Sequence, residues 1–288
     1  MKKSVKKLVV VALGLALGVS MVAGCGSSTK AASNTAGKTE ITGKVTASGS
    51  SALLPLLKIG QEEFMDQNAK VTVNISGGGS FTGQKQVAAG SVDIGNSDVA
   101  VADNLKGKGL VAHKLVGIPF VFITNKANGV DSLTADQYKE ILTGKISNWD
   151  KVGGKNQKIT LIHRAKSSGS RATIAKIVLD NAEFTDDAII QNSNGAVKSA
   201  IATTPGSIGY VDAAYLDDTI KGLKYDGVSY SIKAVTDGKY PVYTFGRMFT
   251  KGEAKGAAKA FIDYVTGEKF QNAHAAKMNF VPITSMKE

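Results

Sequence analysis

Cysteine is almost absent from this 288-residue sequence, which contains only Cys25. A disulfide needs two cysteines and a zinc–thiolate site needs several, so a single chain forms neither. Cys25 also ends an apolar N-terminal segment that we expect to be processed. If Cys25 is modified there, the mature protein has no thiol, which excludes a cysteine nucleophile as well.

Histidine is nearly as rare, and the three imidazoles, at His113, His163 and His274, are scattered along the chain. Metal sites usually show clustered His, Cys, Asp or Glu, so we predict no metal centre. We predict that all three histidines are structural or surface residues. His163 precedes Arg164 in an expected strand, where neighbouring side chains point to opposite faces.

A sequence motif for serine hydrolysis is also missing. No Gly-x-Ser-x-Gly elbow, which presents the nucleophile of many serine hydrolases, occurs in the chain. Serines are nevertheless plentiful, so a secreted serine hydrolase or phosphatase is the alternative from another functional class. A surface adhesin is a third alternative, and it predicts no affinity for small anions.

Basic residues outnumber acidic ones, with 35 Lys and Arg against 24 Asp and Glu and a formal net charge of +11. Removing the four lysines at positions 2, 3, 6 and 7 lowers this charge to +7, and acids are interspersed among the remaining basic residues. A nucleic-acid-binding protein would show a basic cluster with interleaved aromatics, so we predict no nucleic-acid partner. The mild excess favours anionic ligands in general.

Residues 1–24 are typical of an export signal, because four lysines precede the apolar residues 8–23. The ending Val22-Ala23-Gly24-Cys25 resembles the lipobox of bacterial lipoproteins, whose cysteine receives lipid such as palmitate and becomes the first mature residue. The alternative is one transmembrane helix, since the apolar stretch is nearly long enough to span a bilayer. We expect Cys25 to anchor the protein to the outer face of the cell membrane.

Residues 25–40 have no apolar periodicity and consist largely of Ser, Thr, Ala, Gly, Asn and Lys, which predicts a flexible tether. About 248 residues follow it. That length suffices for a large core and is also common for two modest domains.

The stretch at residues 163–171, His-Arg-Ala-Lys-Ser-Ser-Gly-Ser-Arg, indicates an anion site. It follows a strand-like run at 158–162 and precedes Ile174, Ile177 and Val178, whose spacing marks one face of a helix. A strand, a small-residue loop and a helix in that order leave unpaired N–H groups and the positive end of the helix dipole at the loop. Such a place suits an anion.

Four residues of this stretch could supply the contacts. Arg164 can direct two parallel N–H bonds at a tetrahedral oxyanion, and Ser168 and Ser170 add hydroxyl donors. Gly169 lets the backbone approach closely. The alternative is that Ser170 only caps the helix in an ordinary surface loop.

The same order of strand, Gly/Ser loop and helix occurs twice near the start of the globular part. None of the loops is a P-loop, because no Gly-Lys-Ser/Thr follows the glycines. A third short strand then ends at Asp98. Three such loops with an arginine and an aspartate predict several helix N-termini converging on one small anion. The elements expected here are strands at 44–47, 71–75 and 92–98, loops at 48–51 and 77–80, and helices at 53–64 and 81–89.

The apolar run at 116–124 predicts a strand buried on both faces. Thr134 and Gln137 form a capping box before a helix that reaches Leu142. We expect Trp149 to be a buried packing residue. Further strands are expected at 206–211 and 240–245, and helices at 257–265 and 270–276.

Together these residues resemble the phosphate-binding lipoproteins that serve bacterial ABC phosphate importers. The resemblance covers residues 44–283 and implies an α/β, two-lobed class II periplasmic-binding-protein fold with phosphate in the cleft. Lobe 1 would comprise 41–124 plus 244–288, and lobe 2 would comprise 125–243. The segments that carry the resemblance are 47–51, 77–80, 93–98, 142–145 with 148–149, 164–171 and 208–210.

The resemblance also implies a monomeric binding protein without cofactor, which delivers phosphate to ABC permease and ATPase subunits at the extracellular face. Ala52 stands where relatives can have a bulky residue, and Ser170 replaces a common threonine but keeps the hydroxyl. Phe81 stands where a small residue is frequent, and Arg171 is either an extra positive charge or an outward-facing residue. The implied phosphate contacts are Ser51, the backbone of Ala52, Ser80, Asp98, Arg164, Ser168, Gly169 and Ser170.

Asp98 is the residue expected to decide selectivity. An ionised carboxylate only accepts hydrogen bonds, and phosphate at neutral pH still carries a proton whereas sulfate does not. A site that needs a ligand O–H can reject an analogue without one by roughly 10⁴-fold. We therefore predict that Asp98 selects phosphate over sulfate, that arsenate is accepted and that the lobes close by a hinge motion. The alternative is that Asp98 only forms an Asx turn or caps a helix.

Overall fold

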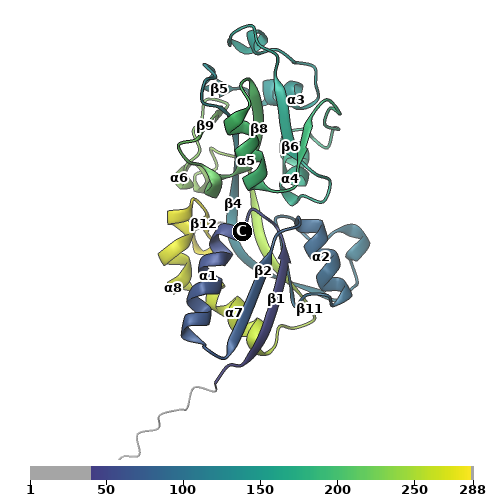
Figure 1. Cartoon of the computed structure of the whole chain (residues 1–288), viewed down its shortest axis with the longest axis vertical. Coiled ribbons are helices and arrows are strands. Elements are labelled where there is room, and N and C mark those ends of the chain that lie inside the picture. Colours follow the sequence, from purple (N-terminus) through teal and green to yellow (C-terminus); the bar gives the residue numbers. More distant parts are fainter. Residues whose placement is uncertain (1–39, 287–288) are drawn as a thin grey trace, which may run out of the picture. The chain divides into compact units, whose positions relative to one another are not determined.

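A long mixed sheet organises the described part of the chain, residues 40–286, whose structure is a computed structural model (Figure 1). Its strands lie in the order β2-β1-β3-β11-β4-β8-β6-β7, with β9 and β12 also paired to β4. The strands are β1 Gly43–Gly49, β2 Val71–Ser76, β3 Ile94–Ser97, β4 Leu110–Asn125, β5 Ser132–Leu133, β6 Thr160–Arg164, β7 Ile189–Gln191, β8 Ser207–Asp212, β9 Ile220–Gly222, β10 Lys224–Tyr225, β11 Tyr243–Lys251 and β12 Val281–Pro282.

Helices cover this sheet, and several of them begin directly after a strand. The α-helices are α1 Leu54–Gln67, α2 Ser80–Ala89, α3 Ala135–Leu142, α4 Gly169–Ile177, α5 Asn194–Thr203, α6 Ile232–Thr236, α7 Gly256–Thr266 and α8 Glu268–Phe270. The short helical turns are η1 Asp103–Leu105, η2 Trp149–Val152, η3 Ala213–Tyr215, η4 Gln271–Ala275, η5 Ala276–Met278 and η6 Ile283–Ser285. The described residues belong to one compact unit that begins at Glu40.

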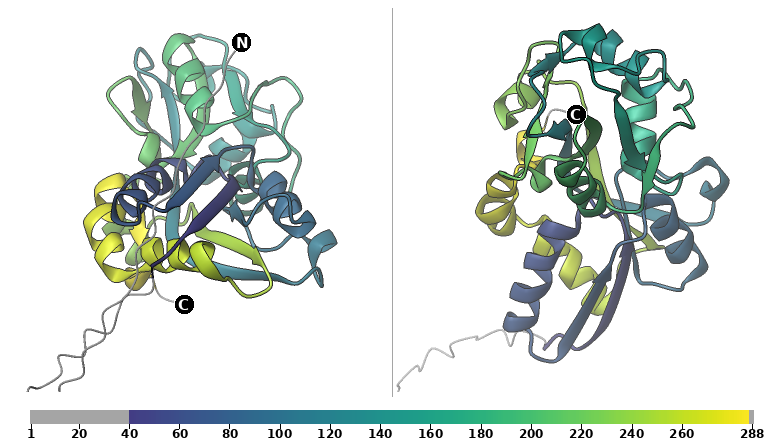
Figure 2. Two further views of the ribbon diagram at one scale, coloured as in Figure 1. Left: turned by 60° about the horizontal axis from the view of Figure 1, so that its bottom comes forward. Right: turned by 45° about the horizontal axis from the view of Figure 1, so that its top comes forward.

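Strand β4 connects two groups of strands. Its residues 110–119 pair antiparallel with β11, and its residues 120–124 pair antiparallel with β8. Figure 1 shows β4 running from the group that holds β1 and β2 to the group that holds β6 and β8, and Figure 2 shows the same crossing from two other directions. Residues 115–125 of β4 are buried, which confirms the prediction of a buried strand at 116–124.

The elements before the first two loops follow from local periodicity. In α1 the predicted face is buried, with Leu56 and Leu57 fully covered and Phe64 3% exposed. Pro55 lies in the first turn, where a missing N–H costs little. Strand β2 alternates as predicted, with every second residue buried from Val71 onward.

Two predicted strands are displaced along the sequence. Strand β6 begins at Thr160 rather than at 158, because Lys158 forms a bridge with Asn148. Strand β11 begins at Tyr243 rather than at 240 and continues to Lys251. The N–H of Tyr240 instead bonds to the carbonyl of Ala234 in α6. Tertiary hydrogen bonds thus set both strand starts.

Two further local predictions are confirmed in the segment between β4 and β6. Thr134 and Gln137 form a complete capping box before α3. Trp149 is 1% exposed, and its indole N–H donates to the carbonyl of Gly206 at 2.8 Å. The predicted export signal, Cys25 and the tether up to residue 39 lie outside the described residues. Between residues 40 and 286, no helix combines the length and the apolar character that crossing a membrane requires.

Candidate functional site

The predicted anion contacts meet where four elements begin or end. Ser51 follows β1, Ser80 begins α2, Asp98 follows β3, and Arg164 ends β6. Ala52 lies beside Ser51 before α1, and the other three contacts, Ser168, Gly169 and Ser170, lie at the start of α4. The structure brings all of them together in the interior, and the seven with a side chain are 2% exposed or less: Ser51, Ala52, Ser80, Asp98, Arg164, Ser168 and Ser170.

Asp98 is held by hydroxyl groups. Ser170 Oγ donates to its Oδ2 at 3.1 Å, and the Ser50 hydroxyl donates to its Oδ1. The backbone N–H of Asp98 donates to Ser80 Oγ at 2.9 Å. Within residues 40–286 no backbone N–H donates to the Asp98 carboxylate, so the alternative of an Asx turn or helix cap finds no support in the described residues.

Burial dominates the electrostatics of this carboxyl group. It raises the pKa of Asp98 above the ordinary aspartate range, and it is opposed first by the Ser50 hydrogen bond and then by the positive charge of Arg164. Smaller opposing effects come from Ser170 and Ser80. The pKa of Asp98 is therefore set by the balance between its burial and the groups that contact its carboxylate.

Three serine hydroxyls of the cluster accept a backbone N–H, which leaves their own proton available for a further acceptor. This arrangement turns each hydroxyl into a donor for an anion. The accepting atoms are Ser51 Oγ, bonded by the N–H of Asn194 at 3.2 Å; Ser80 Oγ, bonded by the N–H of Asp98 at 2.9 Å; and Ser168 Oγ, bonded by the N–H of Arg171 at 3.2 Å.

The start of α4 is packed very closely against the start of α2. Ser168, and not Ser170, is the N-cap of α4, so the alternative that assigned this cap to Ser170 is wrong. A Cβ atom at Gly169 would lie 2.2 Å from Ser80 Oγ and 3.0 Å from Asp98 Cβ. Only glycine permits this approach, which brings two helix N-termini to one place.

Arg164 is almost fully buried, and its Nη2 donates to the carbonyl of Asn192 at 3.0 Å. Burial lowers the pKa of Arg164 and the nearby Asp98 raises it. The guanidinium stays charged because arginine is not deprotonated in proteins at physiological pH. Its Nε has no partner among the described residues.

Arg171 contacts the backbone of Arg164. Its Nη1 donates to the carbonyl of Arg164 at 3.1 Å and lies 3.0 Å from His163 Nδ1. The guanidinium stacks over the ring of Phe184 at 4.5 Å. Burial, and secondarily Arg171, lower the pKa of His163 to about 4, so this imidazole is neutral at physiological pH. His163 is therefore structural, and Arg171 braces the backbone of the strand that carries Arg164.

Sequence reasoning missed three members of the cluster, Ser50, Asn194 and Tyr215. The Asn194 side chain is fully buried, and the Tyr215 hydroxyl donates to the carbonyl of Ser51 at 2.6 Å. A signal for Asn194 was present: Ser193-Asn194-Gly195 follows strand β7 and opens helix α5, as in the other three loops. Four helix starts, rather than three, therefore contribute to this region.

The described residues do not bring a histidine to these serines. The three imidazoles of His113, His163 and His274 bond instead to Thr250, Arg171 and Glu63. The described residues therefore contain no Ser–His pair of the kind that activates the nucleophile of many hydrolases. The same residues contain no group of three His, Cys, Asp or Glu side chains that could hold a metal ion.

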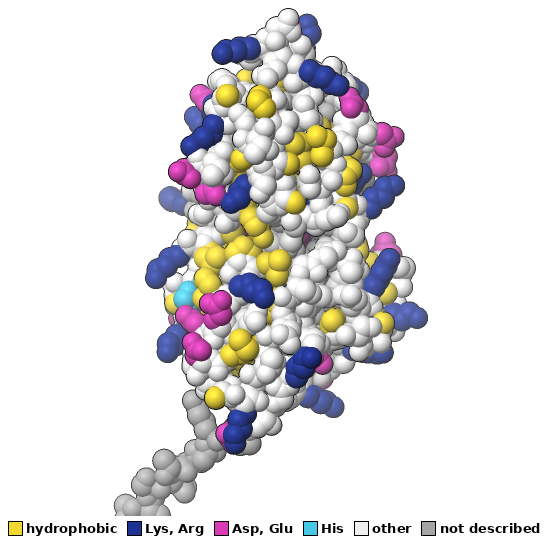
Figure 3. Space-filling view, in the orientation of Figure 1, with side chains coloured by type: hydrophobic (Ala, Val, Ile, Leu, Met, Phe, Trp, Pro, Cys, Tyr) yellow, Lys and Arg dark blue, Asp and Glu magenta, His cyan; other side chains and the backbone are white. Residues whose placement is uncertain are grey.

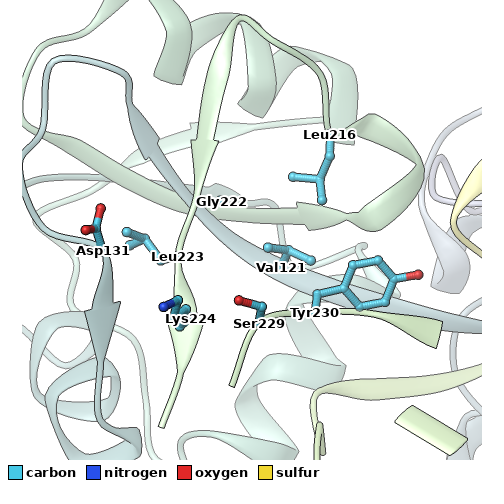
Figure 4. A pocket seen from close by; sticks show the side chains of 8 residues that line it. All are labelled: Val121, Asp131, Leu216, Gly222, Leu223, Lys224, Ser229 and Tyr230. Carbon is cyan, nitrogen blue, oxygen red and sulfur yellow. The ribbon is translucent and has the colours of Figure 1, made fainter. Parts of the chain in front are cut away.

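A cavity of about 330 Å³ lies elsewhere, beside β9 and β10 (Figure 4). Its walls include Val121, Leu223 and Tyr230, and none of the predicted anion contacts lines it. On the face drawn in Figure 3, lysines and arginines are interspersed with acidic side chains rather than gathered in one basic patch. That pattern is typical of a solvated surface.

Comparison with known proteins identifies the family. Residues 31–269 match the PBP superfamily domain. The chain is 42% identical over 294 residues to the phosphate-binding protein PstS of Bacillus subtilis (strain 168). The aligned region covers 100% of this chain and 97% of that protein. This chain belongs to the PstS family.

Two further similarities extend this result. PstS of Borreliella burgdorferi is 29% identical over 248 residues, covering 79% of this chain and 86% of that protein. A crystal structure with bound phosphate, of a Clostridium perfringens protein described as a phosphate ABC transporter substrate-binding protein, has a TM-score of 0.80 at 30% identity. It covers 83% of this chain and 99% of that chain. These relatives are binding proteins and not enzymes, so the predicted fold and the prediction of a non-enzymatic binding protein are both confirmed.

Proposed function

We propose that this protein binds inorganic phosphate between the two groups of strands that β4 connects, and delivers it to an ABC importer. The observation that carries the proposal is the buried Asp98 carboxyl, surrounded by serine hydroxyls and facing the charge of Arg164. A site with many donors and one acceptor is suited to an oxyanion that still carries a proton.

The proposed donors come from four helix starts. Ser51, Ser80 and Ser168 each accept a backbone N–H and can give their own proton to a phosphate oxygen. Arg164 supplies a charged donor pair, and the N–H groups of Ala52 and Gly169 complete the set. Ser170 borders the anion with a hydroxyl that donates to Asp98. Charge-assisted hydrogen bonds of this kind are about twice as strong as neutral ones.

Asp98 is proposed to provide selectivity. One hydrogen bond between the Asp98 carboxylate and a phosphate oxygen requires one proton, and phosphate supplies it at neutral pH. Sulfate cannot supply this proton, so its oxygen would face the buried carboxylate without a hydrogen bond. Arsenate, which is protonated and shaped like phosphate, is expected to bind.

The lobes are proposed to comprise residues 41–124 plus 244–288, and residues 125–243. Strand β4 and the segment before β11 would act as the hinge, because these stretches of chain pass between the two groups of strands. Hydrogen bonds between the groups, such as that from Ser170 to Asp98, would stabilise the closed form. The closed form would then be the state that a permease recognises.

At the cell surface, we propose that lipid on Cys25 and a tether over residues 25–40 hold a monomeric protein beside the permease and ATPase subunits. A lipid anchor restricts the protein to the membrane surface while the tether leaves the binding unit free to rotate.

Calorimetric titration tests the binding proposal. The compact unit that begins at Glu40 would be stripped of bound anion and titrated with phosphate, arsenate and sulfate at pH 7.5. We expect one phosphate per chain, similar binding of arsenate, and sulfate weaker by roughly 10⁴-fold. Absence of phosphate binding would contradict the proposed function, whereas equal binding of sulfate would contradict only the role of Asp98.

A further inference from the structure

Asn194 occupies an unusual position in the phosphate site. Its side chain is fully buried, and its backbone N–H donates to Ser51 Oγ at 3.2 Å. The end of its carboxamide lies within 3.4 Å of Ser51 Oγ, Ala52 N and Arg164 Nη1. All three of those atoms are proposed donors to phosphate, so the carboxamide borders the place where a phosphate oxygen would accept their hydrogen bonds.

The carboxamide has hydrogen-bond partners in two orientations that differ by a half turn. In one, its oxygen accepts from Ala52 N at 3.2 Å and from Arg164 Nη1 at 3.3 Å. In the other, its oxygen accepts from Asp212 N at 3.3 Å and its nitrogen donates to Ser51 Oγ at 3.4 Å. In the second orientation the amide nitrogen faces the donors Ala52 N and Arg164 Nη1, so the first orientation is favoured as long as no anion lies beside them.

These two orientations suit two states of the site. Without an anion, Ala52 N–H donates to Ser50 Oγ at 3.1 Å, and the amide oxygen offers a second acceptor for it and an acceptor for Arg164 Nη1. A phosphate oxygen that accepts from the same donors would be repelled by the amide oxygen, because both atoms carry partial negative charge. Turning the amide places its N–H groups toward the anion instead.

We propose that Asn194 is a further phosphate-binding residue whose carboxamide accepts from Ala52 N–H and Arg164 in the unliganded protein and donates its N–H to phosphate in the complex. This inference rests on the proposed function. It assigns a ligand contact to the start of α5 in addition to those at α1, α2 and α4.

Substitution of Asn194 by Asp tests the donor role, because the two side chains have the same shape. An ionised carboxylate accepts from Ala52 and Arg164 permanently and cannot donate to phosphate. We expect Asn194→Asp to weaken phosphate binding more than about 100-fold at pH 7.5, and Asn194→Ser to weaken it only about 5- to 30-fold. Asn74→Asp, the same change on the exposed face of β2, serves as the matched control and should leave the affinity unchanged.

A pH series separates this role from a structural one. The charged and titratable groups around position 194 are Arg164 on β6, Asp212 on β8, Tyr215 in η3 and Asp98 after β3. Protonation of the carboxyl group that Asn194→Asp introduces restores an O–H donor, so the affinity ratio of wild type to this variant should shrink as the pH falls from 8 to 5. A ratio that stays constant, or an Asn194→Ser variant weaker than Asn194→Asp, would overturn the proposal.

The wild-type protein provides a test in which a variant is needed only to assign one signal. In protein labelled with ¹⁵N-asparagine, the side-chain amide signal of Asn194 is the one that Asn194→Ser lacks. We expect this signal to shift on addition of phosphate and to stay in place on addition of sulfate. An unshifted signal in protein that calorimetry shows to be phosphate-bound would refute the role of Asn194, whereas no calorimetric binding by wild type would refute the proposed function itself.

Discussion

Ser170 Oγ donates a 3.1 Å hydrogen bond to Asp98 Oδ2 across 72 residues of sequence. Ser170 lies in the first turn of α4, and Asp98 follows β3, so this bond joins the two groups of strands that β4 connects. Both residues are buried, so water does not compete for the bond. The proposed selectivity group and the proposed closure contact are thus the same carboxylate.

Replacing Asp98 by Asn should reduce the selectivity for phosphate. The amide can donate to an unprotonated oxyanion, so sulfate affinity should rise and the phosphate-to-sulfate affinity ratio should fall by about 10²- to 10⁴-fold. Calorimetric titration with both anions measures this ratio. Asp103→Asn, whose side chain is 92% exposed, is the control and should keep the wild-type ratio. An unchanged ratio in Asp98→Asn would show that selectivity has another source.

Sulfate binding by the wild-type protein should strengthen as the pH falls. Burial raises the pKa of Asp98, so the carboxyl takes up a proton at higher pH than an exposed aspartate does and then donates to sulfate. The hydrogen bond from Ser50 and then the positive charge of Arg164 oppose this effect. Sulfate affinity should gain up to about tenfold per pH unit while Asp98 is ionised. Titrations between pH 8 and pH 5 check the slope, and Asp98→Asn should show none.

Gly169→Ala should impair phosphate binding without unfolding the protein. The added methyl group would lie 2.2 Å from Ser80 Oγ, so the first turn of α4 would be held away from Ser80 and Asp98. Such overpacking costs about 1–3 kcal/mol, which corresponds to a loss of about 5- to 150-fold in affinity. Alanine favours helix, so the melting temperature without anion should change little. Gly129→Ala, with no atom within 4 Å of the new Cβ, is the matched control.

Asp212→Asn should stabilise the protein at high pH. Asp212 Oδ1 accepts from the N–H of Ala214 at 2.8 Å, and its Oδ2 has no partner among the described residues. Burial, with a further contribution from Asp98, raises the pKa of Asp212 well above its usual range. The folded state therefore favours the protonated carboxyl. The contribution of Asp212 to the stability of the folded state is therefore fully present below about pH 3.9, the pKa of an aspartate in the unfolded chain. It is lost as the pH rises through the pKa that Asp212 has in the folded state.

Thermal melting at several pH values measures this effect. At pH 8 the melting temperature of Asp212→Asn should exceed that of wild type by several degrees, because each kcal/mol of stability corresponds to about 2–4 °C. The difference should disappear near pH 4. Asp217→Asn provides a control of opposite sign, because hydrogen bonds from Lys198 and Thr219 hold the pKa of Asp217 below its usual range. If Asp212→Asn melts below wild type at pH 8, the carboxyl has a stabilising partner that outweighs its burial.

The helices and strands around the two loops at residues 48–51 and 77–80 could be predicted because their signals are local. The buried face of α1 and the alternation of β2 follow from side-chain direction within one element. The boundaries of β6 and β11 could not be predicted, because bonds to Asn148 and Ala234 from other segments decide where pairing starts. Asn194 had a local signal, the strand–loop–helix order that opens α5, but its partner Ser51 lies 143 residues away, and only that contact places it in the site.

The sequence by itself determined the chemistry that this protein has available: serine hydroxyls and glycines at the starts of helices, one arginine after a strand, and an aspartate after another. Those signals are local, because capping, dipole direction and side-chain alternation act within a few residues. Only the tertiary structure decided which of these groups share one site. The sheet order sets which loop ends meet, and the packing of Gly169 against Ser80 sets how close they come, since both depend on contacts between residues far apart in the chain.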